Sequence, residues 1–386
     1  MKKKIAILGS TGSIGLTTLK LINQNKNSFQ VELLSTNTNI KKIKQQIKFH
    51  KVKNIIIHNQ KIFLENRLFF KKSKINLYQN VTEFKKKYRS KLDYVMSSII
   101  GLNGLEPTIE IIDCTKRIAI ANKESIICGW SLIKKKLKKF NTKFIPIDSE
   151  HFSILELIKN EKKKNIKKIY ITASGGPFLK TNKLKLSKFI PRNAIKHPTW
   201  KMGKKISIDS STLINKVYEL IEAKKIFDLN YDDFEIIIQP TSYVHGIVEF
   251  YNGVSKLLTH PTSMEIPIYN SLLFNDKITN ISEIFDIKKM NNLNFQKIDK
   301  FKFPVYQILK NLPQEDSLYE TVLVSANDVL VDLFLKEKIK FYDIYKLLNK
   351  ILRLKEYKKF KILRPKNLSQ IIELSENVRL KTISLS

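Results

Sequence analysis

An acidic stretch near the middle of the chain carries its densest set of chemically active side chains. It reads Pro146-Ile147-Asp148-Ser149-Glu150-His151 and ends an apolar run, 144–147, that is typical of a buried strand. In extended backbone, Asp148 and Glu150 point the same way, roughly 6.5 Å apart. Two such carboxylates repel unless a cation lies between them, and oxygen ligands suit Mg²⁺ or Mn²⁺. A solvated acidic turn is the commoner interpretation of this pattern taken alone, so other parts of the chain must decide.

The elements that position this stretch begin with a strand, a glycine-rich turn and a helix. Residues 5–8 predict a buried parallel strand, Gly9-Ser-Thr-Gly-Ser-Ile-Gly15 a tight turn, and residues 16–23 an amphipathic helix. In this order they favour a dinucleotide site, with the pyrophosphate at the helix N-terminus. A second strand, 30–35, is followed by polar residues and lysines (Thr36 to Lys42) instead of Asp or Glu, which favours NADP over NAD.

Further strand–helix alternation predicts an open α/β sheet, with polar clusters at the carboxyl ends of its strands. Strands are expected near 54–58, 94–98, 118–121 and 168–172. Asn122-Lys-Glu-Ser125 lies where ligands bind in such sheets, although a helix N-cap explains it equally well. Ser174-Gly-Gly176 could form a phosphate-binding nest of N–H groups or a plain turn.

An irregular segment, 191–205, contains two prolines and a glycine that interrupt helices. Its large apolar residues, Trp200 and Met202, have no periodic partners. They indicate a lid that closes over ligand. A loop tryptophan that anchors its segment to the core is the alternative.

A helix is predicted from Leu213 to Phe227, begun by an N-cap signal at 210–212. Its polar side carries Asn215, Glu219 and Glu222 at helical spacing, with Lys216 beside them. Such a face is either solvated or able to bind phosphate at its start and a metal one turn later.

Composition restricts the classes of protein. Lys and Arg number 70 against 35 Asp and Glu, a net charge of +35, but the excess is mostly evenly spread lysine without a nucleic-acid-binding motif. Cys114 and Cys128 lack metal spacing and are expected to be buried free thiols in a reducing compartment. No apolar run is long enough for a signal peptide or membrane span, so a cytoplasmic protein is expected.

Taken together, the motifs closely resemble the 1-deoxy-D-xylulose 5-phosphate reductoisomerase family of the non-mevalonate isoprenoid pathway, over essentially the whole chain. The motifs that carry the resemblance are Gly9-Ser-Thr-Gly-Ser-Ile-Gly15, Ala121-Asn-Lys-Glu-Ser125, Pro146-Ile-Asp-Ser-Glu-His151, Ser174-Gly-Gly-Pro-Phe178, His197-Pro-Thr-Trp-Lys-Met-Gly203 and Asp209-Ser…Asn215-Lys216…Glu219.

The resemblance implies a reaction. A Mg²⁺ or Mn²⁺ ion chelates the ketone and adjacent hydroxyl of 1-deoxy-D-xylulose 5-phosphate as Lewis acid and template. The carbon skeleton rearranges to an aldehyde, 2-C-methyl-D-erythrose 4-phosphate, which NADPH reduces to 2-C-methyl-D-erythritol 4-phosphate. A simple NADP-dependent dehydrogenase of a small phosphorylated substrate is the alternative and needs no carboxylate metal site. A nucleic-acid binder is a third, remote hypothesis.

Site residues follow from the resemblance by position. The implied metal ligands are Asp148, Glu150 and Glu219. Residues matched to catalysis are Lys123, Asp148, Glu150, His197 and Glu219. Residues matched to substrate binding are Lys123, Ser149, Glu150, Ser174, His197, Trp200, Ser210, Asn215, Lys216 and Glu219. Residues matched to NADPH binding are Gly9, Ser10, Thr11, Gly12, Ser13, Ile14, Asn37, Thr38, Asn39, Asn122, Glu124, Met202 and Gly203.

The resemblance also implies architecture. We expect a Rossmann-like NADPH domain (1–147), an α/β catalytic domain (148–275) with the lid 191–205, a connecting segment (276–303) and a C-terminal helical bundle (304–386). A homodimer without nucleic-acid or membrane partners is implied as well.

Several positions depart from the family's usual pattern. Asn37-Thr38-Asn39 replaces Gly-Lys-Asn, Val217 replaces Gly, Gln239 replaces His, and 262–265 lacks an Asp before and an Arg after Met264. These changes predict weaker NADPH binding and an active but sluggish enzyme.

Overall fold

The computed structural model describes residues 1–181, 189–195, 197–200, 202–273 and 285–386. Parts of the predicted lid (196 and 201) and of the predicted connecting segment (276–284) lie outside the described residues. The chain forms two compact units, one of residues 1–148 and 264–279, the other of 149–263 and 280–386.

A seven-stranded sheet with the strand order β4-β3-β2-β1-β5-β6-β7 forms the centre of the first unit. All of its ladders are parallel. The strands are β1 (Lys3–Leu8), β2 (Phe29–Thr36), β3 (Asn54–Ile57), β4 (Asn76–Tyr78), β5 (Tyr94–Ser97), β6 (Arg117–Ile120) and β7 (Lys143–Pro146). Four consecutive residues of β1, 5–8, have no exposed surface, which is the mark of a parallel strand covered on both faces. The predicted Rossmann-like α/β domain is confirmed, and β4 is a strand that the sequence did not predict.

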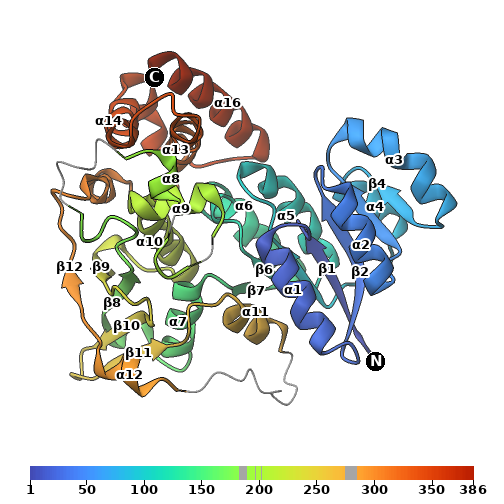
Figure 1. Cartoon of the computed structure of the whole chain (residues 1–386), viewed down its shortest axis with the longest axis horizontal. Coiled ribbons are helices and arrows are strands. Elements are labelled where there is room, and N and C mark those ends of the chain that lie inside the picture. The colour runs from blue at the N-terminus through green and yellow to red at the C-terminus, as the bar shows by residue number, and fades with distance from the viewer. Residues whose placement is uncertain (182–188, 196, 201, 274–284) are drawn as a thin grey trace. The chain divides into compact units, whose positions relative to one another are not determined.

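Helices connect these strands, as Figure 1 shows in blue and teal. They are α1 (Ser13–Gln24), α2 (Ile40–His50), α3 (Gln60–Lys72), α4 (Val81–Lys87), α5 (Leu105–Ile111) and α6 (Lys123–Phe140). A segment far along the chain, α11 (Glu265–Leu272), also packs on α1. Lys20 pairs with Glu265 at 2.5 Å, and the hydroxyls of Tyr94 and Ser271 lie 2.7 Å apart.

The second unit contains a five-stranded mixed sheet, ordered β11-β10-β8-β9-β12. Only the β8–β9 ladder is parallel. The strands are β8 (Ile166–Ala173), β9 (Phe234–Ile238), β10 (Val244–Phe250), β11 (Ser255–Thr259) and β12 (Gln296–Lys297). Helix α7 (Ser149–Ile158) packs on β10 and β11, and α10 (Ile214–Phe227) contacts β8. Shorter helices are α8 (Pro191–Ala194), α9 (Lys204–Ser211) and α12 (Ile287–Asn291).

The C-terminal part of this unit is helical, as predicted (Figure 1). It consists of the 3₁₀ segment Pro304–Asn311, α13 (Tyr319–Leu335), α14 (Phe341–Leu352), α15 (Lys355–Lys358) and α16 (Leu368–Leu385). Helix α13 packs against α14 and α16 and contributes a nearly continuous buried run, which places it at the centre of the bundle. Among the residues that the structure describes, no helix combines the length and apolar composition needed to cross a membrane.

Three local predictions are wrong. The acidic stretch is not extended through Glu150, because α7 begins at Ser149. Residues 210–212 do not provide a helix N-cap, because they lie at the end of α9. The hydroxyls of Ser211 and Thr212 bond back to the carbonyl oxygen of Ile208, at 2.7 and 3.2 Å. The segment 191–205 contains the short helix α8, which Pro191 permits because its ring occupies the first helical position.

Neither cysteine forms a disulfide in the part of the chain that the structure describes, in agreement with the prediction of thiols. Cys128 is buried, whereas Cys114 is only half-buried. Burial raises the pKa of the Cys114 thiol to about 12, so its thiolate is scarce at neutral pH.

Candidate metal and substrate site

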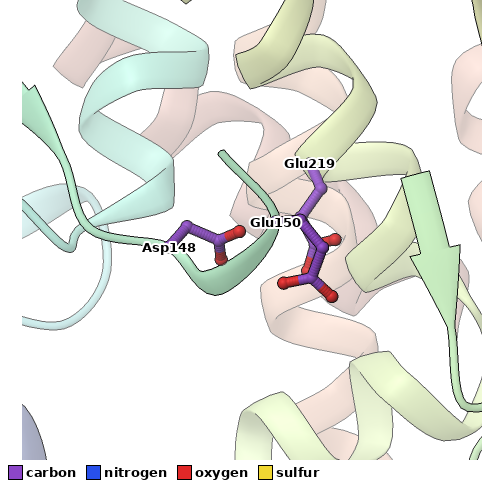
Figure 2. A group of neighbouring side chains, drawn as sticks. All are labelled: Asp148, Glu150 and Glu219. Carbon is purple, nitrogen blue, oxygen red and sulfur yellow. The ribbon is translucent and has the colours of Figure 1, made fainter. Parts of the chain in front are cut away.

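Three carboxylates converge at the start of α7. Asp148 lies in the turn after β7, Glu150 in the first turn of α7, and Glu219 on α10. One oxygen of each lies within 4.8 Å of the others. Figure 2 shows Asp148 projecting from its turn toward the other two side chains. The convergence predicted from the sequence is therefore present, although a helix start produces it instead of extended backbone.

Two lysines supply counter-charge to these carboxylates. Lys123 Nζ lies 2.5 Å from Asp148 Oδ2. Lys216 Nζ pairs with Glu150 Oε1 and lies 2.6 Å from Glu219 Oε2. Three carboxylates and two ammonium groups leave one net negative charge in a site where Glu150 and Glu219 are at most 8% exposed. Burial makes such a charge costly, so the donor set fits a divalent cation that prefers carboxylate oxygens.

Polar neighbours fix the orientation of the carboxylates. Ser149 Oγ donates to Glu150 Oε2, and Asn215 Nδ2 donates to Glu219 Oε1. His151 Nε2 lies 2.8 Å from the backbone oxygen of Glu219, which ties α7 to α10. The buried Asn215 Oδ1 has no hydrogen-bond partner among the residues that the structure describes. An acceptor left in this state marks a place where a donor on water or ligand belongs.

A second cluster contains three of the predicted substrate residues. His197 Nε2 lies 3.0 Å from Ser174 Oγ and 3.1 Å from Ser210 Oγ. Gly176 N donates to Ser174 Oγ at 3.1 Å, and Gly176 has a φ of +65°. A Cβ at Gly176 would lie 3.0 Å from the oxygen of Ser210, so this close approach requires glycine. The Ser-Gly-Gly turn thus brings β8 and α9 together around His197.

The protonation of His197 follows from its contacts. The backbone N–H groups of Thr199 and Trp200 donate to Nδ1 at 3.2 and 3.0 Å. Nδ1 is therefore an acceptor, and the ring proton lies on Nε2, facing the two serine hydroxyls. Burial, with a smaller contribution from the positive charge of Lys216, lowers the pKa of His197 to about 4. His197 is a neutral hydrogen-bond donor at physiological pH.

The predicted lid contacts β10 and the loop that precedes this strand. Trp200 lies edge-on to the ring of His245, with centroids 6.0 Å apart. Thr199 Oγ1 lies 3.1 Å from Ser242 Oγ. Met202 is half-buried and Gly203 exposed, at the start of α9. These contacts describe one arrangement of the segment, and its closure over ligand stays a prediction.

The predicted cofactor loop in the first unit has a backbone that neighbouring atoms approach closely. Gly9 has a φ of +83°, and a Cβ there would lie 2.7 Å from the oxygen of Ser98. Ser10, which has no exposed surface, donates to Gln46 Oε1 at 2.8 Å, so its hydroxyl supports the loop. Gly12, the N-cap of α1, provides no side-chain cap, which leaves the N–H groups of the first turn available to an anion. Thr11, Gly12 and Ile14 are half-buried, and Ser13 is exposed.

The other predicted cofactor residues differ in their exposure and in their local contacts. Asn37, Thr38 and Asn39 are exposed, and Asn39 Oδ1 caps α2 through Lys42 N. Asn122 caps α6 at 2.5 Å through Ser125 N, which confirms the helix N-cap interpretation. The buried Glu124 follows in the first turn of α6.

Several residues that were not predicted from the sequence also make contacts around the site. Asp209 is 2% exposed and accepts hydrogen bonds from Lys205 and Asn327, 3.0 and 2.9 Å away. His245 and His260 stack below Trp200. Only the i, i+4 spacing of Lys205 and Asp209 was detectable in the sequence, because the other partners come from distant segments.

Comparisons with known proteins agree over the whole chain. Family profiles described as 1-deoxy-D-xylulose 5-phosphate reductoisomerase match residues 5–129, and profiles for its C-terminal domains match 144–227 and 260–381. The 1-deoxy-D-xylulose 5-phosphate reductoisomerase of Pelagibacter ubique is 53% identical over 386 residues, all of both chains. The Zymomonas mobilis enzyme in complex with NADPH is 29% identical, with a TM-score of 0.87 over 100% of this chain and 99% of that one. A DOX-P reductoisomerase in complex with NADPH, fosmidomycin and magnesium is 28% identical, with a TM-score of 0.91 over 99% and 98%.

Proposed function

Because the chain belongs to the 1-deoxy-D-xylulose 5-phosphate reductoisomerase family, we propose that Asp148, Glu150 and Glu219 hold the divalent metal ion of this reaction. The protein catalyses the NADPH-dependent conversion of 1-deoxy-D-xylulose 5-phosphate to 2-C-methyl-D-erythritol 4-phosphate in isoprenoid precursor biosynthesis. Its cofactors are NADPH and a divalent metal ion, Mg²⁺ or Mn²⁺. The assignment of the site rests on the cluster of three carboxylates, because a simple dehydrogenase does not require a metal site of this kind.

The metal, when bound, polarises the ketone and adjacent hydroxyl of the sugar phosphate as a Lewis acid. Lys123 lies beside Asp148, where its ammonium can donate to an oxygen of the substrate backbone. Ser149, whose hydroxyl now donates to Glu150, can turn to the same backbone. These two residues orient the chain of carbon atoms that rearranges.

The phosphate group fits the cluster around His197. Ser174 and Ser210 offer hydroxyls, and His197 offers a neutral Nε2–H that adds a donor without adding charge. Asn215 and Lys216 belong to the next helix and contribute an amide and a positive charge. The resemblance to the family implies a phosphate role for Ser174, Ser210, Asn215 and Lys216, and we add His197 from its position between the two serines. Hydrogen-bond donors of these kinds suit phosphate oxygens.

NADPH supplies the hydride and is proposed to bind to the first unit. The turn of Gly9 to Ile14 admits the pyrophosphate to the N-terminus of α1. Asn37, Thr38 and Asn39 lie exposed after β2, where they can reach the 2′-phosphate. Asn122, Glu124, Met202 and Gly203 complete the proposed contacts, and Trp200 is proposed to cover the substrate.

The test is metal-dependent oxidation of NADPH with 1-deoxy-D-xylulose 5-phosphate. Glu150→Gln should lower Mn²⁺ affinity and turnover by about 100-fold or more, because it removes a ligand charge. Glu156→Gln is the matched control, since Glu156 is exposed on the same helix. Turnover that is unaffected by EDTA, or by Glu150→Gln, would contradict the metal site.

Assembly and location are part of the proposal. The homodimer is proposed from the resemblance to the family and the cytoplasmic location from the sequence, and light scattering of the purified protein tests the dimer. The division into 1–147, 148–275, 276–303 and 304–386 is also proposed, and limited proteolysis tests its boundaries.

A further inference from the structure

Four aromatic rings form a continuous column within the second unit. Trp200 lies edge-on to His245, with centroids 6.0 Å apart and an interplanar angle of 76°. His245 stacks on His260 at 3.6 Å and 10°, and His260 lies 6.2 Å from Phe152. These separations lie within the range of direct ring contact, apart from the two histidines, which are closer still. The column therefore runs from the lid segment to helix α7.

Backbone hydrogen bonds fix the orientation of both histidines. His245 Nε2 lies 2.9 Å from the oxygen of His260, and His260 Nδ1 lies 2.7 Å from the oxygen of Pro261. A carbonyl accepts, so each of these nitrogens carries the proton. His260 Nε2 is then an acceptor, and within the described part of the chain it has no hydrogen-bond partner, although His260 is only 6% exposed. The ring of His260 is therefore positioned by its stacking on His245, and in this position its Nε2 atom is buried without a hydrogen bond among the described residues.

His260 stays neutral when the column is intact. Burial, and to a lesser extent the charge of His245, lowers the pKa of His260 to about 3. Two imidazolium rings 3.6 Å apart would repel each other strongly, so the stack requires that the pair not be doubly charged. This condition holds across the physiological pH range.

The ends of the column lie beside both halves of the proposed site. Phe152 follows Glu150 by two residues on α7, and Trp200 follows His197 by three. We propose that His260 is a positioning residue, which supports the ring of His245 and so sets the place of Trp200 over the substrate. This proposal rests on the role of Trp200 in the proposed function. His260 itself makes no contact with reacting atoms.

The resting position of Trp200 can be measured without substrate. The chain has two tryptophans, so Trp130→Phe makes Trp200 the sole reporter. In this background, His260→Ala should shift the emission of Trp200 to the red and increase its quenching by acrylamide, because the support below His245 is lost. His260→Phe restores a flat ring and should return both signals toward the parent values. This readout does not depend on whether the enzyme turns over.

Kinetics then connect the position of Trp200 to the reaction. His260→Ala should raise the KM for the sugar phosphate about 5-fold, the change expected for loss of one aromatic pair, with kcat changed much less. His260→Phe should recover most of the KM. The control Phe334→Leu loosens the same unit at a residue that contacts Phe341, outside the column.

Two outcomes would overturn the proposal. In one, His260→Ala leaves both the emission of Trp200 and the KM unchanged, which means that Trp200 is positioned without His260. In the other, Phe334→Leu produces the same changes as His260→Ala, which means that general loosening is the cause. Absence of turnover in the parent enzyme would contradict the proposed function instead, and the fluorescence comparison would still stand.

Discussion

Replacing Lys216 by methionine should strengthen metal binding while it weakens catalysis. The ammonium of Lys216 pairs with Glu150 and lies 2.6 Å from Glu219. Both carboxylates are proposed metal ligands, so an incoming divalent ion must displace this ammonium. Lys216→Met removes the competing charge and keeps most of the length of the side chain.

The size of the effect follows from the local charges. The wild-type cluster carries one net negative charge, and the variant carries two. Two unit charges about 4 Å apart interact by about 4 kcal/mol at an effective dielectric constant of about 20. The flexible lysine can swing away from an arriving ion, so only part of this energy opposes binding. We expect Mn²⁺ to bind about 10-fold more tightly to the variant, which corresponds to about 1.4 kcal/mol.

The assay is calorimetric titration of Mn²⁺ into the protein without substrate, followed by steady-state kinetics. The kcat/KM should fall about 100-fold in the variant, because the proposed phosphate contact loses its charge. Lys224→Met is the control, since Lys224 is a half-buried lysine of the same helix that lies over Tyr231. Unchanged or weaker Mn²⁺ binding in Lys216→Met would refute the competition and show that the lysine mainly holds the carboxylates in place.

Three further outcomes are expected. Gly9→Ala should raise the KM for NADPH about 10-fold or more, because its Cβ would lie 2.7 Å from Ser98 O in a left-handed conformation, while Mn²⁺ binding is unchanged. Lys225→Met should lower the free energy of unfolding in urea by about 3–5 kcal/mol, because Glu320, 2.7 Å away and 2% exposed, loses its main counter-charge. The pKa of His197 is about 4 in the folded protein, below its value of about 6.5 in the unfolded chain. The free energy of unfolding should therefore fall as the pH drops from about 6.5 to about 4. The urea midpoint of His197→Gln should fall less over the same pH range.

The strands of the first unit were predictable because each is a short apolar run bounded by turn residues. β1, β2, β3, β5 and β6 lie within one residue of the predicted ranges at most ends. β4 was missed since it has three residues, of which only Tyr78 is buried. Local patterns thus identify strands that contain an apolar run, including β7 at the opposite edge, and miss a three-residue edge strand such as β4.

The carboxylates were predictable as a set, but their environment was not. The i, i+3 spacing of Lys216 and Glu219 on one helix could have indicated their ion pair. Lys123 and Asp148, by contrast, are 25 residues apart and meet only because the strands before them, β6 and β7, are neighbours in the sheet. The helix start at Ser149 was missed because the apolar period of α7 becomes visible only from Phe152 onward.

The column from Trp200 to Phe152 could not be predicted. Its members come from four segments, and no periodicity relates them. His245 and His260 look like isolated histidines in the sequence. Only the antiparallel pairing of β10 and β11, which joins Val244 to Thr259, brings them face to face.

Positions that depart from the family pattern are accommodated locally. Val217 lies on α10 and is 1% exposed, so its side chain packs in the interior of the second unit. Gln239, with no exposed surface, accepts a hydrogen bond from Tyr243 N at 2.9 Å and so closes the turn between β9 and β10. Glu265 pairs with Lys20 at 2.5 Å. Val217, Gln239 and Glu265 thus each have their own partner or packing, whereas the three carboxylates converge with no change of residue type. We therefore expect the departures to affect the rate and the affinity for NADPH, and the metal requirement to be retained.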